Sequence, residues 1–186
     1  MELIAKRFLL RDFIEDDLPD FVKYHDDPRS FEFYDLEEAK PNHARELFQI
    51  FKTWSLENPR RNYQLAIIDR RNLKLIGCCG LRRASYDSER AEMGIELAPQ
   101  FWSRYGYAIE VGKALIEFGF CDLGLKEIRG ISVSANLRVA RLARRYGFIE
   151  IGDRSSSNWM SDRGWSQIEW QLTRESWHLL AERRFI

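Results

Sequence analysis

The chain is poor in the residues that cross-link small secreted folds or bind metal ions. Its 186 residues include three cysteines, two of them adjacent (Cys78 and Cys79), and three histidines. An odd count with an adjacent pair argues against a disulfide framework. No Cys-x-x-Cys pair or His cluster has the spacing of metal ligands. We therefore expect no metal site and a reducing, cytoplasmic location, with Cys121 packed in an apolar helix.

Net charge and long apolar runs are also lacking. Lys+Arg and Asp+Glu number 29 each, so the formal net charge is zero. This balance excludes a broadly basic nucleic-acid coat or an acidic tail. The N-terminus is charged from Glu2 onward, and no apolar run has the length of a signal peptide or a membrane span. We expect neither a membrane nor a nucleic acid as a partner.

The sequence contains enough apolar residues to form a globular core. Hydrophobic residues make up 45% of the chain and aromatic residues 13%, which is enough to bury a core at this length. No internal repeat or Gly/Ser linker divides the sequence. We therefore expect one domain over residues 1–186.

Hydrophobic periodicity and turn residues predict a mixed α/β fold. Strands are expected over residues 3–11, 63–68, 73–81, 90–97, 127–133, 148–153 and 167–172. Helices are expected over residues 16–24, 36–54, 106–120 and 136–146, and in a last segment capped by Thr173. Residues 69–72 supply turn chemistry, so the second and third strands should form a hairpin.

The stretch from Glu96 to Ala108 is the most informative one for chemistry. A strand ends there, a short loop follows, and a helix begins near Gly106. The N-terminus of a helix has unpaired N–H groups and a partial positive charge, which suit a phosphate. Arg104 adds a positive charge, and Gly106 allows close approach of a ligand. The alternative is that Gly106 only permits a tight turn between strand and helix.

The whole chain resembles the GNAT superfamily of acyl-CoA N-acyltransferases, and in particular the branch that includes ribosomal-protein N-terminal acetyltransferases. Segments in the right order carry this resemblance: residues 7–12, 75–77, 92–95 and 106–110, Asn136 ahead of Gly147-Phe148, and residues 170–177. The resemblance implies a central, mostly antiparallel sheet, splayed between the fourth and fifth strands and flanked by helices. It also implies acetyl-CoA as co-substrate and an amine as acceptor, and it leaves a homodimer open.

The resemblance also implies which residues hold the coenzyme. The expected coenzyme-binding residues are Ile95, Leu97, Ser103, Arg104, Tyr105, Gly106, Tyr107, Ala108 and Asn136. In the family, backbone groups of the strand pair with the pantetheine arm, and the loop amides hold the pyrophosphate. Ser103 stands where the family has Gln or Arg. Asn136 is also a good N-cap, and that role alone would explain it.

The family's usual general acids are missing from this sequence. Val139 stands where this branch often has Ser, and Ala143 stands where other branches have Tyr. Tyr146 is near, but its spacing places it on the apolar face of its helix, so we expect it in the core.

Glu92 and Glu96 are the candidate catalytic bases. They lie four residues apart on a strand and therefore point to the same face. The alternative is that both are solvated or form cross-strand salt bridges. We assign no catalytic role to His25, His43 or His178. The resemblance implies that the aromatic residues Phe31, Phe33, Tyr34, Trp54 and Tyr86 line the acceptor pocket; the alternative is that they belong to the core.

The function indicated is transfer of an acetyl group from acetyl-CoA to a primary amine by direct attack, the acceptor being a protein N-terminus or a small molecule. The alternative is an acyl-CoA-binding module with little turnover. Four arginines (Arg138, Arg141, Arg144 and Arg145) line one side of the helix over residues 136–146. By default this is a solvated face, although contact with coenzyme phosphates or with RNA stays open.

Overall fold

The computed structural model describes residues 1–35, 42–154 and 158–183. The strands are β1 (Glu2–Ile4), β2 (Phe8–Arg11), β3 (Asn62–Asp69), β4 (Lys74–Arg82), β5 (Arg90–Leu97), β6 (Glu127–Val133), β7 (Ile149–Arg154) and β8 (Gln167–Thr173). The α-helices are α1 (Leu18–His25), α2 (His43–Ser55), α3 (Tyr105–Glu117), α4 (Leu137–Tyr146), α5 (Asn158–Ser161) and α6 (Arg174–Arg183). Short 3-10 turns precede α1 (η1, Glu15–Asp17), follow it (η2, Pro28–Phe31) and precede α3 (η3, Pro99–Phe101).

The strands form one mixed sheet in the order β1-β2-β3-β4-β5-β6-β8-β7. All neighbours are antiparallel except β5 and β6. The expected mixed α/β fold is thus confirmed, with one correction at the start. Residues 3–11 are not one strand, because the chain reverses after Ile4 and β1 pairs with β2. The Ala5 N–H donates to the Phe8 carbonyl at 2.9 Å, which closes this turn.

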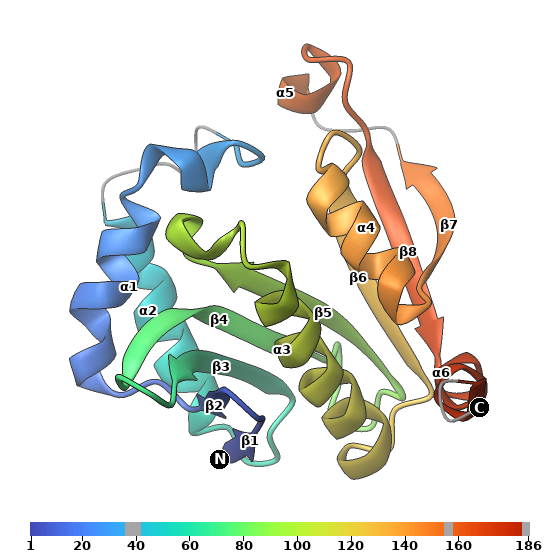
Figure 1. Ribbon diagram of the computed structural model, residues 1–186, viewed down its shortest axis with the longest axis horizontal. Coiled ribbons are helices and arrows are strands. Elements are labelled where there is room, and N and C mark those ends of the chain that lie inside the picture. Colours follow the sequence, from blue (N-terminus) through green and yellow to red (C-terminus); the bar gives the residue numbers. More distant parts are fainter. Residues whose placement is uncertain (36–41, 155–157, 184–186) are drawn as a thin grey trace.

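The sheet splays between β5 and β6, the fourth and fifth of the expected strands. Their parallel pairing covers only three residue pairs, from Arg90↔Glu127 to Glu92↔Arg129. Beyond these pairs the two strands diverge, as Figure 1 shows. We call the paired part the seam. Glu127 lies buried at the seam, where Arg129 and Gln171 donate to its carboxylate.

Helices cover the two faces of the sheet (Figure 1). α1 and α2 pack on one face through an aromatic cluster in which Phe13, Phe21 and Phe48 make edge-to-face contacts. α3 and α4 cover the other face, over a larger core that includes Leu65, Val111 and Ile128. Side chains on β5 therefore alternate between an α1/α2 face and an α3/α4 face.

The helix boundaries depart from expectation in two places. Of the helix expected over residues 36–54, residues 36–41 lie outside the described part of the chain, and α2 begins at His43. The helix expected over residues 106–120 changes after Glu117 into a π-helical turn, η4 (Phe118–Asp122). Cys121, which lies within this turn, is exposed rather than packed as expected, whereas Cys78 and Cys79 are buried.

Other expected boundaries agree with the structure. β5 and β6 begin and end where the sequence places them. Gly147 ends α4 in the left-handed conformation, with φ 91°, as a C-terminal glycine does. Ser176 N–H donates to Thr173 Oγ1 at 3.2 Å, which is the expected cap of α6. In the described ranges, no helix has both the length and the apolarity needed to cross a bilayer.

Candidate active site

The first turn of α3 presents an open backbone surface. The N–H groups of Tyr105 and Gly106 begin the helix and so have no acceptor within it. The N–H of Tyr107, by contrast, donates to the Arg104 carbonyl at 2.8 Å, and the Arg104 N–H donates to Phe101. A Cβ on Gly106 would meet nothing closer than Arg7 Nη2 at 3.6 Å. The space next to the Gly106 Cα is therefore open.

Two arginines flank this turn. Arg7, between β1 and β2, donates to the Gly106 carbonyl at 2.7 Å and to Glu110 at 2.6 Å. Arg104 donates to the Tyr107 hydroxyl at 2.8 Å. Ser103 and Tyr105 are exposed beside them. Both guanidinium groups lie near the helix N-terminus, where positive charge favours an anion. Only Arg104 was singled out from the sequence, since Arg7 is 99 residues from Gly106.

Backbone N–H and C=O groups at the end of β5 face the gap where β5 and β6 diverge. Ala98 N–H donates to Ile76 on the β4 side at 2.9 Å. By the alternation of an antiparallel ladder, Ile95 and Leu97 therefore direct their backbone groups toward β6. The Leu97 carbonyl accepts from the indole of Trp102 at 2.6 Å. The N–H of Leu97 and both groups of Ile95 thus face the divergence between the strands.

Gly77 keeps this end of β5 close to β4. A Cβ at Gly77 would collide with the Glu96 carbonyl oxygen. Only glycine permits such a close approach of two backbones. Gly77 thereby fixes the position of Glu96 and Leu97.

Asn136 heads α4 across the splay from β5. Its side-chain oxygen accepts from Val139 N–H at 3.2 Å, so it is an N-cap. Its amide nitrogen carries two further donors. Tyr146, at the other end of α4, is buried, and its hydroxyl donates to the Ala108 carbonyl. Burial raises the pKa of Tyr146. Tyr146 therefore belongs to the core, as its spacing predicts.

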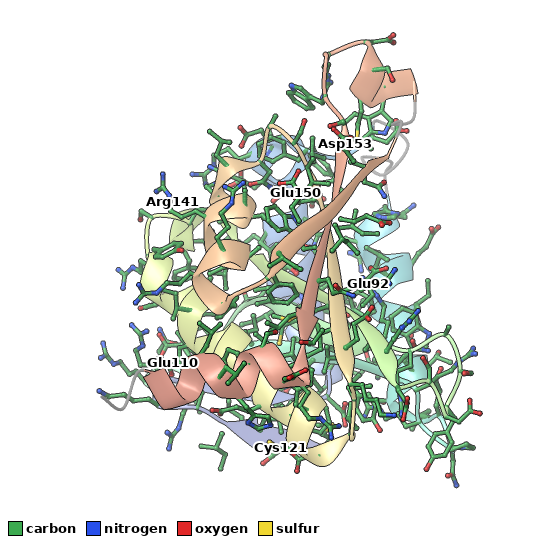
Figure 2. All side chains as sticks on the ribbon, turned by 90° about the vertical axis from the view of Figure 1, so that its right-hand side faces the viewer. Glu92, Glu110, Cys121, Arg141, Glu150 and Asp153 are labelled. Atoms are coloured by element: carbon green, nitrogen blue, oxygen red, sulfur yellow. The ribbon has the colours of Figure 1, made fainter. Side chains whose placement is uncertain are left out.

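Glu92 and Glu96 share the α1/α2 face of β5 but differ in environment. Glu92 lies opposite Arg82 and accepts from it at 2.6 Å, with 44% of its side chain exposed. It borders a hollow also lined by Arg90, Arg129 and Glu169. Figure 2 shows Glu92 on the opposite side of the sheet from Arg141. This geometry matches the cross-strand salt bridge that was the alternative for Glu92.

Glu96 is the more enclosed carboxylate, with 28% of its side chain exposed. Burial raises its pKa to about 7, against a hydrogen bond from the Tyr34 hydroxyl, 3.4 Å from Oε2. His25, the last residue of α1, places Nε2 3.5 Å from Oε1 of Glu96. A carboxylate with a pKa near neutrality can accept a proton from an amine and release it again.

Arg138 spans the mouth of the splay. From α4 it binds Glu32, beyond η2, at 2.5 Å, and its guanidinium lies 4.3 Å from the Trp102 ring centroid. We call Glu32, Trp102 and Arg138 the clasp. Further along α4, Arg144 lies 3.7 Å from Glu150. The arginine side of α4 is thus partly paired within the protein.

A metal site is not evident in the described ranges, where no three His, Cys, Asp or Glu side chains gather. The groups brought together are instead an open helix N-terminus with two arginines, unpaired strand backbone, and a partly buried carboxylate. The first two suit a diphosphate and an extended amide-containing arm.

Known proteins are similar to this chain in sequence. Residues 7–149 match the family model for the acetyltransferase (GNAT) domain. An uncharacterized N-acetyltransferase of Bacillus subtilis, YoaA, is 29% identical over 151 residues, which cover 81% of this chain and 84% of the relative.

Solved structures agree in fold. One is spermidine N-acetyltransferase from Vibrio cholerae in complex with CoA and spermine, with a TM-score of 0.77 at 19% identity. The match covers 92% of this chain and 98% of the Vibrio cholerae chain. A putative ribosomal-protein-serine acetyltransferase from Vibrio cholerae has a TM-score of 0.71 at 17% identity, with coverages of 93% and 97%. The chain therefore belongs to the GNAT acetyltransferase family and is an acetyl-CoA-dependent N-acetyltransferase.

Proposed function

We propose that this enzyme acetylates a primary amine by direct attack in a ternary complex, with Glu96 as the base. The observation that carries the proposal is the position of Glu96, a partly buried carboxylate on the edge of the splay and on the face opposite α3. The coenzyme's diphosphate binds at Tyr105 and Gly106, flanked by Arg104 and Arg7. Its pantetheine arm extends along Ile95 and Leu97 toward Asn136.

The reaction follows from these positions. Glu96 takes a proton from the acceptor ammonium, which frees the nitrogen lone pair. The nitrogen attacks the thioester carbonyl carbon, the C–S bond breaks, and the thiolate leaves with the bonding pair. The second proton of the nitrogen passes to water as the amide forms, and the thiolate takes up this proton from water, so that the coenzyme leaves as a thiol. Glu96 then releases its own proton to solvent. Thiols are weak acids, with a reference pKa near 8.5 for cysteine, so a thiolate can leave without a strong acid. The reaction therefore does not require a hydroxyl at Val139 or Ala143.

The acceptor is a protein N-terminus or a small amine. Membership in the branch that includes ribosomal-protein N-terminal acetyltransferases is our proposal, supported by the order of the sequence motifs. The names of the two Vibrio cholerae proteins give a ribosomal-protein serine as the acceptor of one and spermidine as the acceptor of the other. Their folds are similar to this one to nearly the same degree. Both classes therefore belong in the acceptor screen.

A thiol-release assay tests the proposal. Acetyl-CoA is mixed with the enzyme and, in turn, spermidine, spermine and a peptide with an N-terminal serine. We expect release with at least one acceptor, and a loss of about 10²–10⁴-fold in Glu96→Gln, as for removal of a general base. Glu92→Gln is the matched control, with the same change on the same face of the strand. A larger loss in Glu92→Gln would transfer the role of base to Glu92.

The alternative is an acyl-CoA-binding module with little turnover. The absence of a hydroxyl at both usual acid positions, Val139 and Ala143, favours it. Tight binding of acetyl-CoA without thiol release across the whole panel would support this alternative and reject the enzyme.

A further inference from the structure

His25 is held in one orientation beside Glu96. Its Nδ1 lies 2.9 Å from the Phe21 carbonyl oxygen, one turn back in α1. Its ring lies 4.2 Å, between centroids, from both Phe21 and Tyr24. Only 12% of its side chain is exposed. These contacts leave Nε2 as the ring atom that faces Glu96.

The contact with Phe21 determines the tautomer of His25. A carbonyl oxygen can only accept a hydrogen bond, so Nδ1 must carry a hydrogen. In the neutral ring Nε2 then carries a lone pair. The Nε2 atom that carries it lies 3.5 Å from Oε1 of Glu96. Such contacts in ligand-free enzymes are often long and shorten during the reaction.

The surroundings favour the neutral ring. Burial lowers the pKa of His25 to about 4, and His43 on α2 adds to this effect, while the Phe21 carbonyl and Asp26 oppose it. The other groups that face the pair are Tyr24, Tyr34 and the Cys78 thiol of β4. Burial raises the pKa of Cys78 to about 12 and that of Tyr24 well above its usual value. Both groups are uncharged at neutral pH.

We propose that His25 is a positioning residue that shares a single proton with Glu96, accepting at Nε2 from the protonated carboxyl Oε1. The proposal rests on the proposed function, in which Glu96 is the base. When Glu96 is ionised, its negative oxygen and the imidazole lone pair face each other, and they repel. Uptake of the acceptor's proton replaces this repulsion with a hydrogen bond. His25 therefore makes Glu96 a stronger base and holds its acid form in place.

The first test needs neither coenzyme nor acceptor. The full chain is labelled with ¹⁵N-histidine, and the His25 resonances are assigned by their loss in His25→Asn. We expect Nδ1 to stay protonated from pH 5 to pH 9, while the Nε2 shift follows the ionisation of Glu96, with a midpoint near pH 7. In Glu96→Gln the Nε2 titration should vanish.

Three outcomes would overturn the proposal. They are a hydrogen on Nε2 of the neutral ring, a charged imidazolium at neutral pH, and an Nε2 shift that does not change with pH. This test requires no turnover. If the protein is inactive but shows the expected titration, the proposed function is rejected, and the proposal that His25 and Glu96 share a proton is still supported.

The second test uses kinetics with the best acceptor from the screen. In His25→Asn the side-chain amide can still donate to the Phe21 carbonyl, but nothing replaces Nε2. Loss of one hydrogen bond to the acid form should move the acidic limb of the pH profile of kcat/KM down by about one pH unit. His43→Asn is the matched control and should leave that limb in place. An unmoved limb in folded His25→Asn would reject the role of His25, even if Glu96→Gln is inactive.

Discussion

We expect the substitution Gly106→Val to weaken binding of the coenzyme while leaving the stability of the fold almost unchanged. The nearest atom to a new Cβ at this position is Arg7 Nη2, at 3.6 Å, which is an ordinary contact distance. Valine is also a somewhat better helix former than glycine, by roughly 0.4 kcal/mol. We therefore expect the free energy of unfolding to change by less than about 0.5 kcal/mol.

Coenzyme binding should respond very differently. The valine side chain would occupy the space through which a phosphate reaches the N–H groups of Tyr105 and Gly106. A hydrogen bond to a charged group contributes about 1.5–3 kcal/mol, so losing one lowers affinity about 10- to 100-fold. Isothermal titration calorimetry with acetyl-CoA measures this loss, and urea denaturation measures the stability. An unchanged Kd in a folded variant would refute the assignment of this turn to the diphosphate.

Gly112→Ala is the matched control on the same helix. A Cβ there would collide with the Tyr146 ring and hydroxyl. Tyr146 is buried and bonded to Ala108, so it cannot move without disturbing the core. We expect a loss of about 1–3 kcal/mol in stability, as for overpacking. The two glycines should thus show opposite patterns, with lost affinity at 106 and lost stability at 112.

Three further predictions concern Glu96 and the clasp. The folded state holds a proton on Glu96 up to about pH 7, whereas the unfolded chain loses it near pH 4.5, so wild-type stability falls as pH rises across this window. Urea denaturation should therefore show Glu96→Gln to be more stable than wild type at pH 8, by on the order of 1–3 kcal/mol, and no more stable at pH 4. A gain in stability at both pH values would contradict the raised pKa of Glu96. Trp102→Phe removes the donor to Leu97 and should cost about 1 kcal/mol of stability, and a loss below a few tenths would mean that the bond contributes little. A double-mutant cycle of Arg138→Ala and Glu32→Ala should return a coupling below about 1 kcal/mol, since both side chains are half exposed; a larger coupling would show that the ion pair is shielded from water.

Local patterns predicted the middle of the sheet well. The bounds of β5 and β6 follow from alternation and from the breaks that flank them, such as Pro99. The reversal between β1 and β2 was missed because it contains no glycine, proline or asparagine to mark a turn. The π-turn after α3, which contains the exposed Cys121, also has no simple sequence signal.

Local structure at the candidate site was predictable where its groups are close in sequence. The helix start near Gly106 and the N-cap at Asn136 agree with the structure, whereas the coenzyme-binding role of the loop from Ser103 to Ala108 stays a prediction from the family resemblance. Arg7 and His25 could not be found from the sequence, because each reaches its partner through the tertiary fold, His25 from α1 to β5. The two glutamates were equivalent by spacing, and only burial and the Arg82 salt bridge distinguish them.

One buried carboxylate links the strands that meet at the seam. Glu127 joins β6 to β8 through Gln171, at 2.9 Å, and lies 3.6 Å from Arg90 of β5. Burial opposes its ionisation, but hydrogen bonds from Arg129 and Gln171 hold its pKa below the usual value. The short parallel pairing of β5 with β6 is thus reinforced by the polar contacts of one buried carboxylate, which reaches side chains of β5, β6 and β8.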